Sequence, residues 1–561
     1  MSAEGSAGVR AAAKLAAISA DYLDDLAERH PDFATGLGDH RFDGRLPERT
    51  RASLDAERSA LTGFADRLAA LTAATGEDSA LASELRVDAA MLGNDVARRL
   101  FRLEELREET WNPLLANPGR AIYGLLARDF APLPDRLLSV TGRLAAVPAA
   151  LNDARGLLGA MPKVHLETAI AQFGGTIRIV REQVDAALAE APPAMAAEIG
   201  KVRPAALEAI AAHRDWLSAK LAGDDTDDGN GNGGFADPRI GPERFARKLS
   251  LTLDAEADAD AILARAGADL ARVTEEIIEV AAALGGSSRE VMTRLAADPP
   301  DDDTILRFCS DAFTAQTAFV RDHDLVTLYD DPVQIIVMPE VDRGASTAYC
   351  DSPGPLEQAP LATFIAVSPT PADWPAERKA SYYREQNRHR VHAVLAHEGV
   401  PGHYLQLQHS RRFGGATLAR SALWSGTFVE GWAVYAEELM AAHGYPGEGD
   451  PREFRVQQLK RQLTGIINAI LDARTHTRDM TEAEAVALMT GPGFQEESTA
   501  LVKWRRTLLT SAQLSTYYVG YVEVSELVRE LLAVPGATER AVHDRVLAHG
   551  SPPVGLLRTL L

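Results

Sequence analysis

Apolar side chains recur every three or four residues along most of the chain, which is the spacing of one face of an α-helix. The first such stripe lies near the N-terminus and is formed by Leu15, Ile18, Tyr22 and Leu26. Pro31 should end that helix, because proline cannot donate the backbone hydrogen bond that a helix needs. Similar stripes continue to about Leu221 and show no fixed repeat period. We therefore expect a helical N-terminal lobe over residues 1–221.

A segment rich in glycine, asparagine and aspartate, residues 222–238, follows this lobe. It has almost no apolar residue to bury, so we expect a flexible surface loop or a boundary between two lobes. Another helical stripe begins beyond it and consists of Leu263, Ala266, Leu270, Val273, Ile277 and Leu284. Gly285 and Gly286 should end this second helix, because glycine commonly terminates helices.

Two short β-branched segments change the pattern. Residues 333–338 and 363–367, each next to a proline, predict β-strands. Tyr349 and Cys350 lie in the glycine- and proline-rich stretch between them. After about Trp374 the helical spacing returns and continues to the end of the chain. The predicted class is therefore mainly α, with a small β-sheet inside a helical protein.

Composition agrees with this class and limits the expected partners. Hydrophobic residues make up 46% of the 561 residues and aromatic residues 6%, with abundant alanine and leucine, a mix that favours helices. The formal charge of −22 repels phosphates and anionic lipids, so neither a nucleic-acid nor a membrane partner is expected. Two cysteines are too few for a disulfide framework. The N-terminus lacks the apolar core of a signal peptide and no long apolar run follows, so we expect a cytoplasmic protein.

Candidate metal ligands follow the predicted sheet at His397 and His403, with Glu398 beside the first histidine. Two histidines on one helix, with a glutamate next to the first, are typical of zinc peptidases. The usual spacing is four residues, whereas a spacing of six places the imidazoles roughly 120° apart on a regular helix, too far to share an ion. Pro401 and Gly402 should break the helix and swing His403 back toward His397.

A third ligand is expected from the amphipathic segment 428–438, whose start carries Glu430. Glu437 lies on the same helical face and could accept a hydrogen bond from a ligating histidine. Two histidines and one glutamate leave a fourth position open for water, as in catalytic rather than structural zinc sites. His392 and His409 are alternative ligands in the same region, and a helix whose histidines are only hydrogen-bonded is the alternative without a metal.

Two motifs of this region, HEGVPGHYLQ from His397 and FVEGWAVYAEEL from Phe428, resemble the bacterial family catalogued as domain of unknown function 885. The family pattern is similar to HE-x-x-P-G-H-x-x-Q followed by EGWA-x-Y-x-E. The segments HPDFATGLGDHRFD from His30 and DPRIGPERFARKL from Asp237 also look like family segments. The family is grouped with zincin-like peptidases of the gluzincin type. The resemblance implies one continuous unit with a zincin-like helical fold, in which the N-terminal lobe forms one wall of a deep cleft and residues 239–561 form the catalytic lobe.

The family's C-terminal pattern, D-x-G-x-H followed by R…P-G-Q-A-x-S-Y, is similar to the sequence around His476, Arg506 and Tyr517. This chain departs from that pattern at Arg474, Ser511, Ala512, Leu514 and Thr516. These departures bear on the shape of the local loop and leave the three candidate functional side chains in place.

Metal-assisted amide hydrolysis assigns a role to each candidate. Zinc lowers the pKa of a bound water and polarises the carbonyl, while Glu398 takes the proton and passes it to the leaving amine. Tyr517 is the first candidate and His476 the second for donating to the oxyanion. Arg506 could hold a substrate carboxylate. The strands could hold an extended substrate at a sheet edge, with Tyr349 lining the cleft, or only cover the helical core.

The sequence therefore predicts a zinc-dependent hydrolase, foremost a peptidase for small or unfolded peptides. The alternatives are a metal hydrolase of non-peptide amides and a non-catalytic scaffold or binding protein with a structural metal. Two histidines and one glutamate suit Zn²⁺ better than cobalt or manganese.

Overall fold

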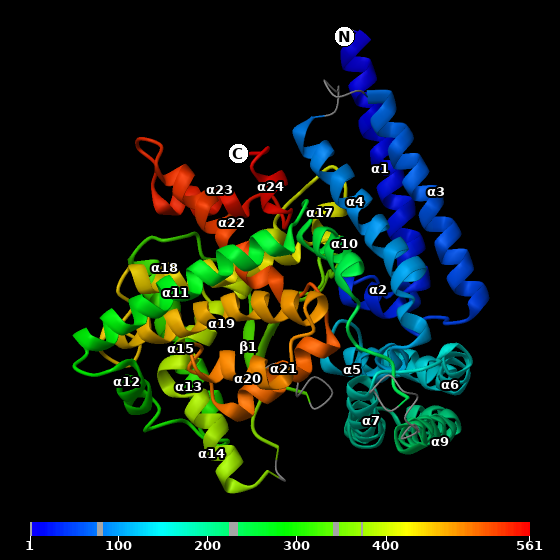
Figure 1. The fold of residues 1–561 in the computed structure, drawn as a ribbon. Helices are drawn as coiled ribbons and strands as arrows, with labels where there is room; N and C mark the ends of the chain where they lie inside the picture. Colours follow the sequence, from blue (N-terminus) through cyan, green and yellow to red (C-terminus); the bar gives the residue numbers. More distant parts are fainter. Residues whose placement is uncertain (1–2, 76–81, 224–233, 340–346, 372–373) are drawn as a thin grey trace.

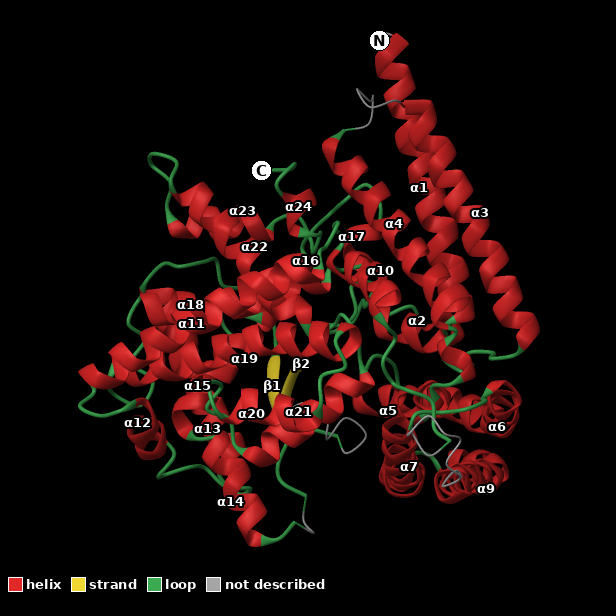
Figure 2. Ribbon diagram, in the orientation of Figure 1, coloured by secondary structure: helices red, strands yellow, loops and turns green. Residues whose placement is uncertain are grey.

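The computed structural model describes residues 3–75, 82–223, 234–339, 347–371 and 374–561. Within these ranges the chain is mainly helical and holds one small sheet, as predicted (Figures 1 and 2). The loop predicted at residues 222–238 lies largely outside the described residues, which omit 224–233. Among the described helices, none combines the length and the apolar character that crossing a membrane requires.

Two separate hydrophobic clusters organise the N-terminal half. The first joins α1, α3 and α4, which extend away from the rest of the molecule (Figure 1), and the second lies among α5 to α9. The helices are α1 (Ala3–Arg29), α2 (Pro31–Leu37), α3 (Arg51–Thr75), α4 (Ser83–Phe101), α5 (Gly119–Ala127), α6 (Leu133–Leu157), α7 (Lys163–Arg178), α8 (Val184–Ala189) and α9 (Pro193–Gly223). Short 3-10 or π turns join them at η1 (His40–Phe42), η2 (Arg102–Leu106), η3 (Glu108–Thr110), η4 (Pro113–Ala116) and η5 (Ile179–Gln183).

The predicted N-terminal stripe is confirmed. Its four residues, Leu15 to Leu26, are all buried in the first cluster, and α1 ends at Arg29, just before Pro31. The same bundle packs against the C-terminal half through Arg420, a fully buried guanidinium whose Nε lies 2.6 Å from Asp88 Oδ1 of α4. The first helices of the chain are therefore fixed to its last third by a buried ion pair.

The C-terminal half contains the sheet and the remaining helices. These are α10 (Pro242–Leu253), α11 (Ala259–Ala283), α12 (Ser288–Leu295), α13 (Ile305–Asp322), α14 (Ala376–Glu385), α15 (Arg388–Glu398), α16 (His403–Arg411), α17 (Ala419–Ala422), α18 (Gly426–Ala442), α19 (Pro451–Thr477), α20 (Glu482–Thr490), α21 (Glu497–Leu509), α22 (Ser515–Leu532), α23 (Glu539–Leu547) and α24 (Val554–Leu557). The second predicted stripe forms α11, which ends before Gly285, where the backbone has a φ of 83°.

Both predicted strands are present, as β1 (Val333–Val337) and β3 (Thr363–Val367), and they pair in parallel. A third strand, β2 (Ala348–Asp351), was not predicted and pairs antiparallel with β3, giving the order β1-β3-β2. Figure 2 shows the strands surrounded by helices of the C-terminal half. β2 is therefore an edge strand.

Close contact between α18 and α22 fixes the centre of this half. A Cβ atom on Gly431 would lie 2.3 Å from the carbonyl carbon of Gly520, so the two helices touch where neither has a side chain. Glu430 precedes this contact on α18, and Tyr517 lies one turn before it on α22. The crossing thus sets the positions of two candidate functional side chains.

Candidate metal centre

The helix carrying His397 breaks before His403. α15 ends at Glu398 and α16 begins at His403, with Gly402 immediately before it. A Cβ atom on Gly402 would lie only 1.9 Å from the His397 carbonyl oxygen, so a larger residue does not fit this turn. The indole Nε1 of buried Trp432 donates to the Pro401 carbonyl at 2.9 Å and fixes the turn from α18. The break predicted from proline and glycine is present.

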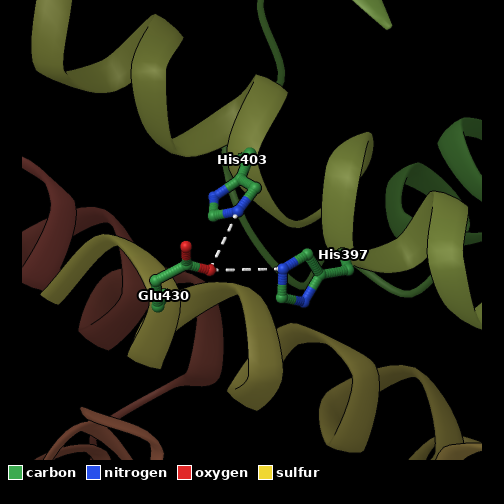
Figure 3. A group of neighbouring side chains, drawn as sticks. All are labelled: His397, His403 and Glu430. Atoms are coloured by element: carbon green, nitrogen blue, oxygen red, sulfur yellow. Dashed lines mark ion pairs between the residues drawn. The ribbon is translucent and has the colours of Figure 1, made fainter. Parts of the chain in front are cut away.

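The break brings His397 and His403 to Glu430 (Figure 3). Glu430 Oε2 lies 3.4 Å from His397 Nε2 and 3.4 Å from His403 Nε2. Ligand atoms held about 2.0–2.1 Å from a tetrahedral zinc ion are separated by roughly 3.3–3.4 Å. The two distances from Glu430 Oε2 therefore fit a zinc ion, and all three ligand atoms lie within 4.8 Å of one another.

Charge and burial make the three groups interdependent. Burial alone would lower the pKa of His397, but hydrogen bonds with Glu430 and Glu437 outweigh it and raise that pKa to about 9. Burial would raise the pKa of Glu430, yet both histidines hold it well below its ordinary value. Buried Glu430 Oε2 has no hydrogen-bond partner among the described residues beyond these ion pairs. A carboxylate oxygen in that position suits a cation.

Glu437 orients the first histidine from behind. Its Oε1 lies 2.8 Å from His397 Nδ1, so the carboxylate accepts a hydrogen bond from Nδ1–H while Nε2 faces Glu430. Arg461 of α19 donates from Nε and Nη2 to the two oxygens of Glu437, at 2.7 and 2.8 Å. Glu437 is 1% exposed, so this is a buried and firmly held contact. The structure thus brings Glu437 to the place that the sequence indicated.

Glu398 faces a cavity of about 270 Å³ beside the three groups. Helices α14, α15, α18, α19, α21 and α22 and the ends of β2 and β3 supply its walls. No described residue hydrogen bonds the partly exposed Glu398 carboxylate, so its oxygens are available to a ligand in the cavity. This is the environment that a general base requires.

Tyr517 and Arg506 line the same cavity. The ring of Tyr517 stacks near His397, with 6.4 Å between the ring centroids, and Arg506 Nη2 donates to the Tyr517 hydroxyl oxygen at 3.2 Å. Burial, followed by the charge of Glu430, raises the pKa of Tyr517, so its hydroxyl keeps its proton. A protonated phenol beside the metal centre can donate a hydrogen bond.

One departure from the family pattern, Ala512, lies in the loop before Tyr517. Ala512 adopts a left-handed backbone with a φ of 64°, a conformation that favours the glycine of the pattern. Asp472 holds the loop by accepting from the backbone nitrogens of Ala512 and Ser515, at 2.9 and 3.0 Å. Because the Ala512 side chain is buried in a hydrophobic cluster, its burial offsets part of the backbone cost.

The family described as "Bacterial protein of unknown function (DUF885)" matches residues 31–561 of this chain. The chain belongs to the DUF885 family. No curated protein matches it. A solved structure described as "a putative lipoprotein of unknown function from Shewanella oneidensis" is 27% identical, with a TM-score of 0.79 over 97% of this chain and 99% of that chain. A second, "the putative lipoprotein from Colwellia psychrerythraea", is 17% identical and shows the fold alone, with a TM-score of 0.78 over 99% and 98%.

The predicted cytoplasmic location is wrong on this comparison. The 27% identical protein from Shewanella oneidensis is described as a putative lipoprotein, and lipoproteins carry a lipid anchor. The prediction rested on an N-terminus without the apolar core of a signal peptide and on the lack of a long apolar run in the sequence.

Several predicted residues of this DUF885 protein lie apart from the centre. His476 accepts a hydrogen bond from Ile240 N–H at Nδ1 and donates from Nε2 to the Thr510 carbonyl, at 3.4 and 2.9 Å, and it is not among the described residues that line the cavity. The structure therefore gives it a buried structural contact instead of a place near the oxyanion. Tyr349 lies on β2, next to Ala348, which does line the cavity.

The side chains of the two alternative ligands make other contacts. His392 contacts Glu448 at 2.8 Å and the Tyr445 hydroxyl at 2.9 Å, and His409 contacts the Thr327 carbonyl at 2.9 Å. Neither belongs to the cluster of possible metal ligands found among the described residues. Among the candidate ligands, His397, His403 and Glu430 are therefore the set that the hypothesis of a metal site retains.

Two residues of the site were missed, Arg461 and Lys503. Arg461 supports Glu437, and Lys503 lines the cavity. Burial first, and then the guanidinium group of Arg506, lower the pKa of Lys503 to about 7. Neither residue belongs to the matched motifs, and each lies on a helix rich in charged residues, so no pattern in the sequence distinguishes them from surface charges.

Proposed function

We propose that this DUF885 protein is a zinc-dependent hydrolase that cleaves amide bonds in small or unfolded peptides. The observation that carries the proposal is the convergence of His397, His403 and Glu430, with their ligand atoms within 4.8 Å of one another, beside a cavity that Glu398 faces. The donor set, two imidazoles and one carboxylate, suits zinc among the common metals. Metal-binding residues on a broken helix and on a following helix are also the basis for proposing a zincin-like fold.

Bound zinc would supply a water of lowered pKa and a polarised substrate carbonyl. Glu398 would take a proton from the attacking water and deliver it to the nitrogen of the leaving amine. The C–N bond thus breaks, the acyl carbon gains the hydroxyl of the water, and the amine nitrogen gains its proton. Glu398 is suited to this role because it is ionisable, partly exposed and adjacent to His397.

The remaining residues would position the substrate and stabilise charge. Tyr517 would donate its hydroxyl proton in a hydrogen bond to the oxyanion, since it keeps that proton and lies beside His397. Glu437 and Arg461 would hold the His397 ring in one tautomer. These assignments give each group close to the cavity a separate task.

An extended peptide has a suitable surface in β2. This strand is at the edge of the sheet, and Ala348 and Thr347 line the cavity at its start. A role for Tyr349, on the same strand, remains part of this proposal.

A second cavity supports the proposal that the N-terminal half forms one wall of a substrate cleft. It has a volume of about 860 Å³ and lies between α7 and α21. It shares Arg378, Ser498 and Val502 with the first cavity. Space for a longer substrate therefore adjoins the metal centre.

The test is metal content and turnover in four variants of the full chain. Wild-type protein should bind one equivalent of zinc and hydrolyse members of a peptide pool. Glu398→Gln should keep the zinc and lose turnover by about 10²–10⁴-fold, while His403→Ala should lose the zinc. Glu438→Gln and His409→Ala are matched controls, because these side chains contact Tyr521 and Thr327 away from the cavity.

Each alternative has its own outcome in this experiment. Hydrolysis of small N-acyl compounds but no peptide would assign a non-peptide amide substrate. Zinc binding with no turnover of either kind, and no effect of Glu398→Gln on any measured property, would overturn the hydrolase proposal in favour of a structural metal.

A further inference from the structure

The cavity beside the metal centre has an unusual excess of positive charge for so acidic a chain. Its walls carry five cationic side chains, namely Arg378, Arg390, Arg461, Lys503 and Arg506. Two of these are neutralised, because Arg461 pairs with Glu437 and Arg390 pairs with Glu385 at 3.2 Å. The other three have no ion pair with any described residue. A net charge of −22 makes such cations exceptional, so their location needs an explanation.

Lys503 and Arg506 are the two unpaired cations closest to the candidate chemistry. They lie three positions apart on α21, so they share one face of the helix. The Lys503 ammonium group has no hydrogen-bond partner among the described residues, and Arg506 has only the uncharged Gln513 and Tyr517 as partners. Two neighbouring cations that have no ion pair with a described residue favour an anionic ligand between them.

The lowered pKa of Lys503 also supports an anionic ligand at this position. Burial and neighbouring guanidinium groups cause it, which means that the cavity disfavours a further positive charge. An anion bound there would oppose this effect and stabilise the charged ammonium group.

The position of Arg506 limits how far such an anion lies from the reacting bond. Its guanidinium group contacts the Tyr517 hydroxyl at 3.2 Å, and the Tyr517 ring centroid is 6.4 Å from that of His397. About one side chain therefore separates the cation from the metal centre. An extended peptide advances by about 3.3–3.6 Å per residue, so one or two residues cover this separation.

We infer that Lys503 and Arg506 bind the C-terminal carboxylate of the substrate, so that the enzyme removes one or two residues from the carboxyl end of peptides. This inference rests on the proposed hydrolase function and names its substrate class and a specificity-determining residue, Lys503. The carboxylate receives hydrogen bonds from the Lys503 ammonium group and from the Arg506 guanidinium group. The small volume of the cavity, about 270 Å³, is consistent with a short leaving segment.

Equilibrium binding tests this inference without any need for turnover. The zinc-loaded Glu398→Gln chain is titrated with Ala-Ala-Ala as the free acid, with its C-terminal amide, and with Ala-Ala-Asp amide. We expect the acid to bind about 10- to 100-fold more tightly than the amide, the range for a hydrogen-bonded charge pair. The aspartyl amide should bind as weakly as the alanyl amide, because its carboxylate is not at the chain end.

Substituting the cations shows which residue causes the tighter binding of the acid. Adding Lys503→Met should reduce the ratio of acid to amide binding by about tenfold. Adding Arg455→Met instead should leave the ratio unchanged, since Arg455 pairs with Glu276 of α11 at 3.0 Å and is not among the described residues that line either cavity. Thermal melting and zinc content confirm that each variant is folded.

The results separate this inference from the proposed function. Equal binding of acid and amide, no measurable binding of the acid, or a ratio unaffected by Lys503→Met would overturn it. Equally tight binding of Ala-Ala-Asp amide would overturn the assignment to the chain end. Wild-type protein that hydrolyses acids and amides at the same rate is a hydrolase without this specificity, whereas a preference for the acid with no turnover rejects the hydrolase and retains the carboxylate site.

Discussion

Gly402→Ala should destroy the proposed metal site while changing the chain by a single methyl group. That methyl carbon would lie 1.9 Å from the His397 carbonyl oxygen and 2.4 Å from that of Ala396, whereas contacts below 3.0 Å essentially never occur. The backbone must therefore move by about 1 Å, and both obstructing atoms belong to the turn that positions the ligands. Metal sites tolerate deviations of only about 0.2 Å in their ligand distances. His403 would then no longer reach an ion bound by His397 and Glu430.

The expected loss of zinc affinity exceeds the roughly 10- to 100-fold that follows from losing one supporting contact, because here a ligand itself is displaced. The metal-free protein should lose about 1–3 kcal/mol of unfolding free energy from the overpacked turn. Zinc affinity is measured by competition with a chromophoric chelator, and stability by urea unfolding without metal.

Gly414→Ala is the matched control, since a Cβ atom there would meet nothing within 4 Å. It should keep wild-type zinc affinity and stability. A Gly402→Ala protein that binds one equivalent of zinc as tightly as the wild type would refute the argument that this turn creates the site.

Two further results are expected. Glu437→Gln keeps the shape of the side chain but removes the charge that Arg461 and His397 contact. Zinc affinity, measured by competition with a chelator, should therefore fall about 10- to 100-fold. An unchanged affinity would contradict the role given to Glu437. His213 is fully buried, and its Nδ1 accepts a hydrogen bond from Arg155. Burial, and then the charge of Arg155, lower the pKa of His213 from 6.5 to about 4. The folded chain therefore resists a proton that the unfolded chain accepts. The unfolding free energy should therefore fall by at most about 3 kcal/mol as the pH is lowered from 6.5 to 4. This part of the pH dependence should be missing in His213→Gln. If it persists in that variant, the lowered pKa of His213 is not its cause.

Local rules of the backbone explain what could be predicted from the sequence. The apolar spacing of α1 and α11 and the β-branched runs of β1 and β3 depend only on neighbouring residues, and so does the break at Pro401-Gly402. The break matters most, because it turns an unfavourable spacing of two histidines into a shared site. The motif around Glu430 and Glu437 could be matched for the same reason, since its residues lie within two turns of one helix.

Contacts between distant segments of the chain determined the features that the sequence did not predict. β2 is a strand only because β3 supplies its hydrogen bonds, and Arg461 is a buried partner of Glu437 only because α19 packs beside α18. His476 resembled a catalytic residue in the sequence, yet its ring nitrogens are taken by the backbone of Ile240 and Thr510.

The sequence by itself therefore determined the main helical stripes, two of the three described strands, where the helix carrying His397 must break, and which residue types could hold an ion. Only the tertiary structure decided which charges are neutralised and which, like Lys503, remain unpaired beside the cavity. The reason is physical: backbone conformation follows from neighbours in the chain, whereas the electrostatic environment of a side chain is set by groups that folding brings to it from many segments.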